Sequence, residues 1–221
     1  MAYFDRREIA LGQHSASSAP GLYRRFAKRL FDLCVVTLLA VPVLIVVSLL
    51  AVVVAMDGKS PFYLQKRVGH NGREFFMIKL RSMVPDADRQ LTKYLSENAE
   101  ARREWDLMQK LQFDPRITPI GNFIRKTSLD ELPQLWNVLT GEMSLVGPRP
   151  IMTCQKEIYP GEAYYNMRPG ITGLWQVSER NEASFAQRAF YDNLYDGEIT
   201  FASDISIMMR TVGVVFLAKG R

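Results

Sequence analysis

The chain has 221 residues, of which 48% are apolar and 23% charged, and its formal net charge is +5. These proportions suit a globular domain of ordinary size and exclude an intrinsically disordered chain. The two cysteines, Cys34 and Cys154, are far apart in the sequence, and there are two histidines. This composition argues against a disulfide framework, a zinc site and His-based triad chemistry.

The N-terminal region divides into a tail and an apolar segment. Residues 1–22 contain several small and polar residues without an apolar period, which is typical of a mobile tail. Four cations follow between residues 24 and 29, and Leu33 to Met56 is a run of 24 uncharged residues. A helix rises about 1.5 Å per residue, so such a run is long enough to cross a hydrocarbon core of roughly 30 Å. We therefore expect residues 23–58 to associate with a membrane.

Pro42 lies inside this apolar run, where a proline removes one helical hydrogen bond and clashes with the preceding turn. Basic residues flank the run on both sides, and the positive-inside rule places both flanks in the cytoplasm. This pattern favours a re-entrant helix that breaks near Pro42, enters one leaflet and returns. A kinked single-span anchor and a cleaved signal peptide are alternatives, although the apolar core of a signal peptide has only about 7–15 residues.

Residues 59–221 predict an α+β body that is rich in helix. Aromatic-rich runs at 62–68 and 74–79 flank Gly69–Gly72, and the Asn71-Gly72 pair in this segment is typical of a β-hairpin turn. Strong helix formers from 86 to 112 predict one or two surface helices.

Three helical regions are expected farther along the chain. One covers 122–139 and is interrupted at Pro133, and a second covers 184–195. The last, at 205–217, contains one charge among thirteen residues. It is either a buried core helix or an amphipathic helix at the membrane interface.

The densest cluster of charge is Arg125-Lys126-Thr127-Ser128-Leu129-Asp130-Glu131-Leu132-Pro133. The spacing of Ser128 and Glu131 fits a capping box, which is a purely structural interpretation. Alternatively the helix begins close to Pro133, because proline prefers the first helical turn. Asp130 and Glu131 then lie at a helix N-terminus, whose partial positive charge keeps carboxylates ionised and can hold an anionic substrate. Spacing alone leaves both interpretations open.

Other cations lie beside turns or at strand ends. Arg149 lies between Pro148 and Pro150, a rigid presentation that suits a phosphate. The remaining candidates follow the second strand or bracket a turn, and they are Lys79, Arg81, Arg168 and Arg180. Each taken singly is an ordinary solvated side chain or ion-pair partner. The excess charge gathers next to the apolar run and no recognition motif is present, so we expect no nucleic-acid partner.

With these motifs in place, the chain resembles the bacterial sugar transferase family, the monotopic phosphoglycosyl transferases, over roughly residues 24–221. The resemblance rests on motifs in the same order along the chain: Lys28–Asp32, Arg67–Gly69 with Phe76–Met83, Asp114–Thr118, Lys126–Asn137, Gly141–Pro150 and Arg168–Val177.

The resemblance implies a two-step transfer of a sugar 1-phosphate at the cytoplasmic face of the bacterial inner membrane. Asp130 would attack a nucleotide sugar, expected to be a UDP-sugar, and release UMP. The covalent phosphosugar would then pass to undecaprenyl phosphate and prime exopolysaccharide synthesis. Glu131 matches the second carboxylate of the family's dyad, which binds Mg²⁺, while Lys79, Arg125 and Arg149 match positions around the phosphates.

Residues 86–112 and Leu135-Trp136-Asn137 resemble the branch that often transfers galactose or glucose. The resemblance leaves homo-oligomerisation open. The alternative from another class is a membrane-tethered adaptor without catalysis, which accounts for the charge and the apolar run but not for Asp130, Glu131 and Arg149.

Overall fold

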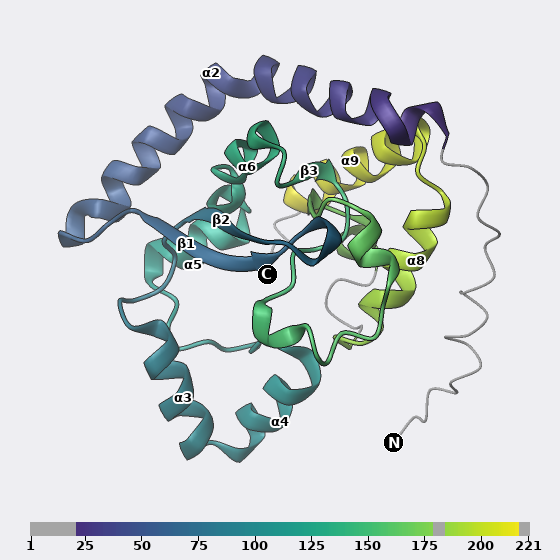
Figure 1. The fold of residues 1–221 in the computed structure, drawn as a ribbon. Coiled ribbons are helices and arrows are strands. Elements are labelled where there is room, and N and C mark those ends of the chain that lie inside the picture. The colour runs from purple at the N-terminus through teal and green to yellow at the C-terminus, as the bar shows by residue number, and fades with distance from the viewer. Residues whose placement is uncertain (1–20, 179–183, 217–221) are drawn as a thin grey trace.

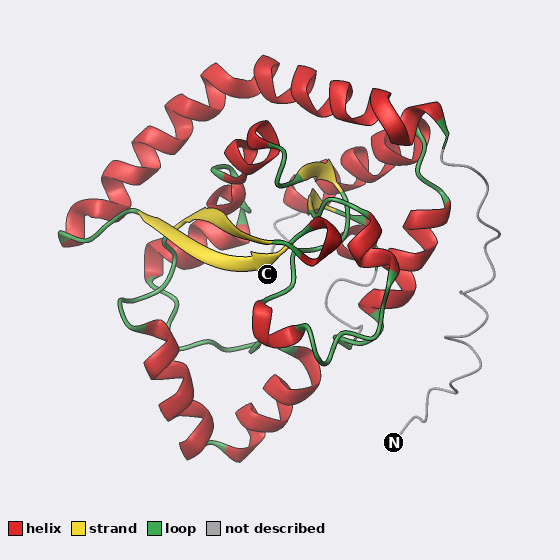
Figure 2. Cartoon of the chain, in the orientation of Figure 1, coloured by secondary structure: helices red, strands yellow, loops and turns green. Residues whose placement is uncertain are grey.

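The computed structural model describes residues 21–178 and 184–216 (Figure 1). The tail predicted at 1–22 falls almost wholly outside these residues, as does Arg180. The described chain is rich in helix and contains one antiparallel hairpin (Figure 2), which confirms the predicted content of secondary structure.

One long helix arches over the rest of the molecule (Figure 1). A π-helical turn at Tyr23–Ala27 leads into α2, Lys28–Val54, and a 3-10 turn at Ala55–Asp57 ends it. The segment Tyr23–Asp57 is long and apolar enough to cross a membrane, and its most apolar 18-residue window has a mean hydropathy of 3.1. Only 11% of its most apolar window is buried, whereas the core helix of a soluble protein is mostly buried.

Helix α2 continues through Pro42, so the helix is not broken there as expected. Proline removes a single hydrogen bond, and the helix bends into an arch instead of ending (Figure 1). The body supports the helix beyond the proline, because Val47 and Val54 pack in one cluster with Leu80 and Ile124. The prediction that the helix re-enters one leaflet remains a prediction.

The predicted hairpin is confirmed. Strands β1, Phe62–Val68, and β2, Glu74–Leu80, pair antiparallel, with Tyr63 opposite Lys79. Asn71 and Gly72 in the connection both have positive φ, +56° and +73°. These are the conformations that Asn and Gly tolerate best, which explains their place in the turn.

The surface helices predicted at 86–112 are also present. They are α3, Ala87–Glu97, and α4, Ala99–Met108, and they project away from the rest of the molecule (Figure 1). Asn98 separates them, and its side-chain oxygen accepts hydrogen bonds from the backbone N–H groups of Glu100 and Ala101. Asparagine therefore caps α4 while ending α3.

The predicted helical region 122–139 consists of α5, Pro119–Lys126, a 3-10 turn at Leu129–Glu131, and α6, Gln134–Thr140. The strands that follow are β3, Ser144–Val146, and β4, Gly170–Thr172, with 3-10 turns at Thr153–Gln155 and Ala163–Asn166 between them. The helices that follow are α7, Leu174–Val177, α8, Arg188–Gly197, and α9, Phe201–Phe216. The helix predicted at 184–195 therefore begins four residues later.

Strands β3 and β4 pair in parallel and bring their flanking segments close together. A Cβ atom on Gly170 would lie 2.1 Å from the backbone nitrogen of Gly147, so no other residue fits at this crossing. The chain leaves β3 through Gly147 and reaches Arg149 two residues later. The close approach of Gly147 and Gly170 thus fixes the backbone position from which Arg149 extends.

The main core cluster joins α2 to the body, because it contains Val36 of α2, Met77 of β2, Val146 of β3 and Ile207 of α9. Helix α9 has two faces: Asp204 and Ile207 are buried, while Met209 and Val212 are exposed. It is therefore neither wholly buried nor wholly superficial, and it packs against β3, β4 and α7.

Candidate active site

Asp130 and Glu131 lie in the 3-10 turn that precedes α6, and Pro133 is the residue immediately before that helix. Ser128 has a positive φ of +56° and its side chain makes no capping hydrogen bond. The capping-box interpretation is therefore wrong. The helix begins directly after Pro133, and the two carboxylates lie just ahead of its first turn.

Lys79 of β2 joins the two carboxylates. Its Nζ atom lies 2.9 Å from Oε1 of Glu131 and 3.9 Å from Oδ2 of Asp130. Arg149 approaches from the loop after β3, with Nη2 3.3 Å from the same Oε1 atom of Glu131. Three segments that are far apart in the sequence thus supply the predicted residues to one cluster, here called the dyad site.

Asn137 explains how β2 and α6 come together. Its side-chain oxygen accepts the N–H of Ile78, 3.0 Å away, and its amide group donates to the carbonyl oxygen of Phe76 at 2.8 Å. The side chain, 1% exposed, therefore pairs with the outer edge of β2 as a neighbouring strand would. This contact holds Lys79, the next residue along the strand, against the turn that carries Asp130.

Burial dominates the electrostatics of the dyad site. Asp130 is 7% exposed, and its removal from water raises the pKa of its carboxyl group. The positive charges of Lys79, Arg125 and Arg149 oppose that rise without cancelling it, and the neighbouring Glu131 adds to it. Burial likewise lowers the pKa of Lys79. The sequence interpretation, that the surroundings simply keep Asp130 ionised, omitted this desolvation.

Sequence reasoning gave no role to Arg67, which supports Arg149. Its guanidinium donates to the carbonyl oxygen of Pro150 at 2.8 Å and to the side-chain oxygen of Gln65 at 2.5 Å. Burial, and after it the nearby charge of Arg149, lowers the pKa of Arg67 to about 10. In the sequence, Arg67 is one charged residue near the end of the aromatic-rich first strand. Its burial becomes evident only when the loop that contains Pro150 is seen to pack against it.

Comparison with known proteins now identifies the chain's relatives. Residues 23–218 match the model of the family described as bacterial sugar transferase. The chain belongs to the bacterial sugar transferase family.

Three curated relatives illustrate this. The chain is 46% identical to the UDP-galactose-lipid carrier transferase of Erwinia amylovora, over all of this chain and 46% of that protein. It is 43% identical to the exopolysaccharide production protein ExoY of Rhizobium meliloti, over 88% of this chain and 87% of that protein. It is 45% identical to the undecaprenyl-phosphate galactose phosphotransferase of Salmonella typhimurium, over 89% of this chain and 42% of that protein. The chain thus spans less than half the length of the Erwinia and Salmonella proteins.

Two arginines predicted for the site of this bacterial sugar transferase do not join the dyad. Arg81 forms an ion pair with Asp57 at 2.6 Å and donates to the carbonyl oxygen of Val54, which ties the end of α2 to the hairpin. Arg168 donates to the carbonyl oxygen of Gly141 at 2.9 Å and lines a different cavity. Arg81 follows the second strand and Arg168 precedes a turn, as predicted, but both side chains face other parts of the fold. Arg180 lies outside the described residues.

Within residues 21–178 and 184–216, no group of three or more His, Cys, Asp or Glu side chains could hold a metal ion by itself. Asp130 and Glu131 nevertheless offer adjacent carboxylate oxygens, the ligand type that Mg²⁺ prefers. Mg²⁺ is usually held by one or two carboxylates together with substrate phosphates and water. The two carboxylates fit such a shared site, with Glu131 also contacting Lys79 and Arg149.

Proposed function

We propose that this chain is a phosphoglycosyl transferase, which moves a hexose 1-phosphate from a UDP-sugar to undecaprenyl phosphate and so primes exopolysaccharide synthesis. The observation that carries the proposal is the contact of two adjacent carboxylates with Lys79 and Arg149. The Salmonella relative is named for phosphotransfer of galactose to undecaprenyl phosphate, and a 36% identical protein of Escherichia coli is named UDP-glucose:undecaprenyl-phosphate glucose-1-phosphate transferase. These names support galactose or glucose as the sugar.

In the proposed first step, a carboxylate oxygen of Asp130 attacks the β-phosphorus of the UDP-sugar. The bond from that phosphorus to the bridging oxygen breaks, and UMP leaves with the electron pair. In the second step, an oxygen of undecaprenyl phosphate attacks the same phosphorus. The bond to Asp130 breaks, which regenerates the carboxylate and yields the polyprenyl diphosphate sugar.

The surroundings of Asp130 suit a nucleophile. Attack on a charged diphosphate is slow unless cations neutralise the phosphoryl oxygens, and Lys79, Arg125 and Arg149 place positive charge near Asp130. The buried position of Asp130 limits access of water, which would otherwise hydrolyse the covalent phosphosugar. Mg²⁺, held by Glu131 and the diphosphate, would supply further neutralisation of the phosphates when bound.

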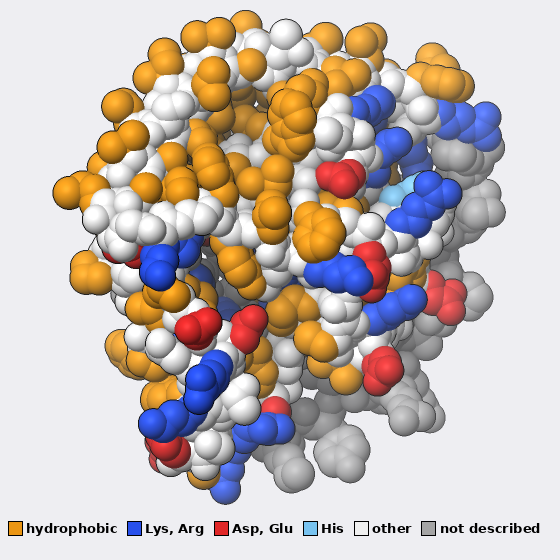
Figure 3. Space-filling view, turned by 60° about the vertical axis from the view of Figure 1, so that its left-hand side comes forward, with side chains coloured by type: hydrophobic (Ala, Val, Ile, Leu, Met, Phe, Trp, Pro, Cys, Tyr) orange, Lys and Arg blue, Asp and Glu red, His pale blue; other side chains and the backbone are white. Residues whose placement is uncertain are grey.

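The outer surface of α2 supports the proposed location at the cytoplasmic face of the bacterial inner membrane. Apolar side chains along it are strongly exposed, and they include Leu38, Val41, Leu44, Leu49 and Val52. Figure 3 shows apolar side chains gathered over the upper and left-hand part of this face, with basic side chains at its upper right and charged side chains of both signs lower down. An apolar surface of this extent indicates contact with a membrane or another apolar partner. A membrane is the partner that would also contain the proposed lipid acceptor. We propose that α2 enters one leaflet and that both its ends lie in the cytoplasm.

The test is release of UMP by purified protein with Mg²⁺ and a panel of UDP-sugars, with and without undecaprenyl phosphate. We expect turnover that requires the lipid and prefers one sugar. We also expect Asp130→Asn to abolish turnover, while Asp106→Asn, at an exposed ion pair of α4, retains it. Turnover by the Asp130→Asn variant would contradict the role of Asp130. Absence of UMP release with every donor would favour the adaptor.

A further inference from the structure

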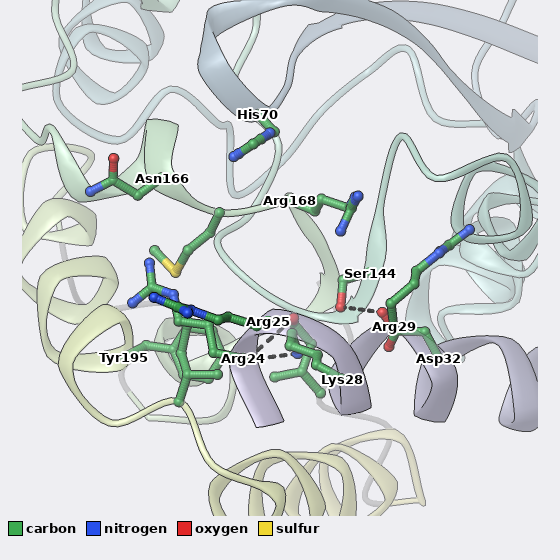
Figure 4. A pocket seen from close by; sticks show the side chains of 13 residues that line it. Arg24, Arg25, Lys28, Arg29, Asp32, His70, Ser144, Asn166, Arg168 and Tyr195 are labelled. Carbon is green, nitrogen blue, oxygen red and sulfur yellow. Dashed lines mark hydrogen bonds between the residues drawn. The ribbon is translucent and has the colours of Figure 1, made fainter. Parts of the chain in front are cut away.

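A second basic site lies where α2 begins. A cavity of about 160 Å³ is enclosed by the first turns of the helical segment, the hairpin turn at His70 and the segment that carries Arg168. Figure 4 shows Arg24, Arg25, Lys28 and Arg29 along one side of this cavity, with Arg168 and His70 across from them. We call it the basic pocket.

Two of the five cations that line the basic pocket are paired with carboxylates. Arg24 contacts Asp196 at 2.5 Å, and Lys28 contacts Asp204 at 2.5 Å. The only acidic side chain in the lining is Asp32, whose two oxygens accept hydrogen bonds from the hydroxyl of Ser144 and the N–H of Leu145. Both carboxylate oxygens of Asp32 therefore already accept hydrogen bonds from the segment that carries β3.

The other three cations form no ion pair within 4.0 Å with a described carboxylate, although the charge of Asp32 attracts Arg29 from a greater distance. Arg29 donates to the carbonyl oxygens of Val138 and Leu139, at the end of α6. The Nε–H group of Arg168 donates to the carbonyl oxygen of Gly141. Arg25 is exposed and pairs with no described carboxylate. Three guanidinium groups thus gather around one small cavity whose lining holds a single carboxylate, Asp32. The resulting excess of positive charge favours a negatively charged ligand.

The size of the cavity limits that ligand. A single water molecule needs roughly 10–15 Å³, so 160 Å³ accommodates a phosphate group and the atoms next to it. Pockets for drug-sized molecules begin at about 300 Å³, so a complete nucleotide is a poor fit. The pKa of His70 is lowered by partial burial and by the charge of Arg168, so this side chain is neutral near pH 7 and can donate one N–H without adding charge.

The position of the basic pocket suggests the source of the phosphate. It lies at the start of the helix that carries the apolar run, beside the exposed side chains of Phe26 and Leu30. The dyad is elsewhere under the arch, because Leu129 and Leu132, which flank Asp130, pack with Val47 and Val54 in the second half of α2. The basic pocket and the dyad site therefore lie at different positions along α2.

We propose that the basic pocket binds the phosphate of an anionic membrane phospholipid, whose acyl chains lie along the apolar face of α2. Guanidinium groups pair with phosphate oxygens through two parallel hydrogen bonds. Arg25 and Arg29 reach the cavity from the first turns of the long helical segment, and Arg168 reaches it from the opposite side. The proposal rests on the membrane location proposed above but not on the transfer reaction.

The experiment measures phospholipid retained by the purified full-length protein by native mass spectrometry. The detergent-solubilised protein is mixed with phosphatidylglycerol or with phosphatidylcholine. The main variant is Arg25→Gln/Arg168→Gln. The matched control, Lys59→Gln/Arg103→Gln, removes the same charge from two exposed positions outside the pocket. Arg25→Gln alone serves as a second variant, because its side chain has no described partner whose loss would disturb folding.

We expect the wild type and the control to retain phosphatidylglycerol over phosphatidylcholine, and the double variant to retain at least fivefold less, with Arg25→Gln in between. Equal retention of both lipids, or unchanged retention by the double variant, would overturn the proposal. Displacement of the lipid by millimolar inorganic phosphate or UMP would assign the pocket to a soluble anion instead. Lipid retention is read without turnover, so failure of this proposal and failure of the proposed reaction are distinguishable.

Discussion

At the scale of single residues, the dyad site places two carboxylates and one ammonium group where little water reaches them. Lys79 is the cation that contacts both carboxylates. Burial raises the pKa of Asp130, and the charge of Lys79 is the largest opposing influence. The amount of ionised Asp130 near neutral pH therefore depends on Lys79.

We expect Lys79→Met to reduce UMP release at pH 7 by at least about 100-fold, since a preorganised charge beside the reacting phosphate is lost. The pKa of Asp130 should rise further, so the acidic limb of the pH–rate profile should move to higher pH and part of the activity should return in alkaline buffer. Lys66→Met, on the exposed face of the same hairpin, is the control. A variant profile parallel to that of the wild type would contradict this role.

Asp192 gives a second prediction, about stability and pH. Complete burial raises the pKa of this carboxyl group to about 7, although the hydroxyl of Tyr159 and the charge of Arg188 oppose the rise. The folded protein therefore holds this proton up to about pH 7, whereas the unfolded chain releases it near pH 4. The stabilisation is complete below pH 4 and is lost as the pH rises through 7, by at most about 4 kcal/mol.

Thermal unfolding of the detergent-solubilised protein should therefore show a lower midpoint at pH 8 than at pH 5.5. Asp192→Asn should reduce that difference, because the amide does not titrate. The exposed Asp106 provides the matched variant Asp106→Asn, which should keep the full difference. An undiminished pH dependence in Asp192→Asn would assign the effect to other groups.

The residues that the sequence predicted for the site come together only in part. Asp130, Glu131, Lys79 and Arg149 meet as expected, because adjacent carboxylates and an arginine between prolines are local signals. Arg81 follows the second strand and Arg168 precedes a turn, yet Arg81 pairs with Asp57 and Arg168 lines the basic pocket. A residue's position beside a turn does not tell which side of the fold that turn faces.

At the scale of elements, the contact between α6 and β2 depends on Asn137. We expect Asn137→Ala to lower the free energy of unfolding by about 2–4 kcal/mol, because it leaves the N–H of Ile78 and the carbonyl oxygen of Phe76 without their partner. UMP release should fall as well, since the contact holds Lys79 beside the dyad. Asn122→Ala, on the exposed face of α5, is the control and should change the unfolding free energy by less than about 0.5 kcal/mol.

An element could be predicted when the contacts that form it join residues close together in the sequence. The hairpin and helices α3 and α4 arise from neighbouring residues, so turn chemistry and helix propensity sufficed. The parallel pairing of β3 with β4 joins residues 144 and 170, and nothing in either short strand indicates its partner. Pro42 was misread for a related reason: its local effect favours a break, but packing against the distant residues Leu80 and Ile124 supports the continuous helix.

At the scale of the whole molecule, the two cysteines test the proposed membrane location. Cys34 lies on α2 and Cys154 on the body, and both are exposed in the isolated structure. In inverted membrane vesicles, with the cytoplasmic face outward, a membrane-impermeant maleimide should label Cys154 and leave Cys34 unlabelled. Both should react after the membrane is dissolved.

The single-cysteine variants Cys34→Ser and Cys154→Ser assign each signal to its residue. Labelling of Cys34 in intact vesicles at the rate seen for Cys154 would show that this part of α2 is outside the bilayer. Such a result would contradict the proposed location and leave the chemistry of the dyad site untouched.

The buried contacts of the first helical segment also constrain the order of events during synthesis. Asp32 bonds to Ser144 and Leu145, more than a hundred residues later, and Tyr23 and Lys28 bond to Asp204 in α9. The apolar helix therefore leaves the ribosome long before its polar anchors exist. With the membrane location proposed above, this helix would meet the lipid before the C-terminal helix has been translated. A ribosome stalled ahead of α9 would then hold an inserted chain that still lacks the contacts of Tyr23 and Lys28 with Asp204.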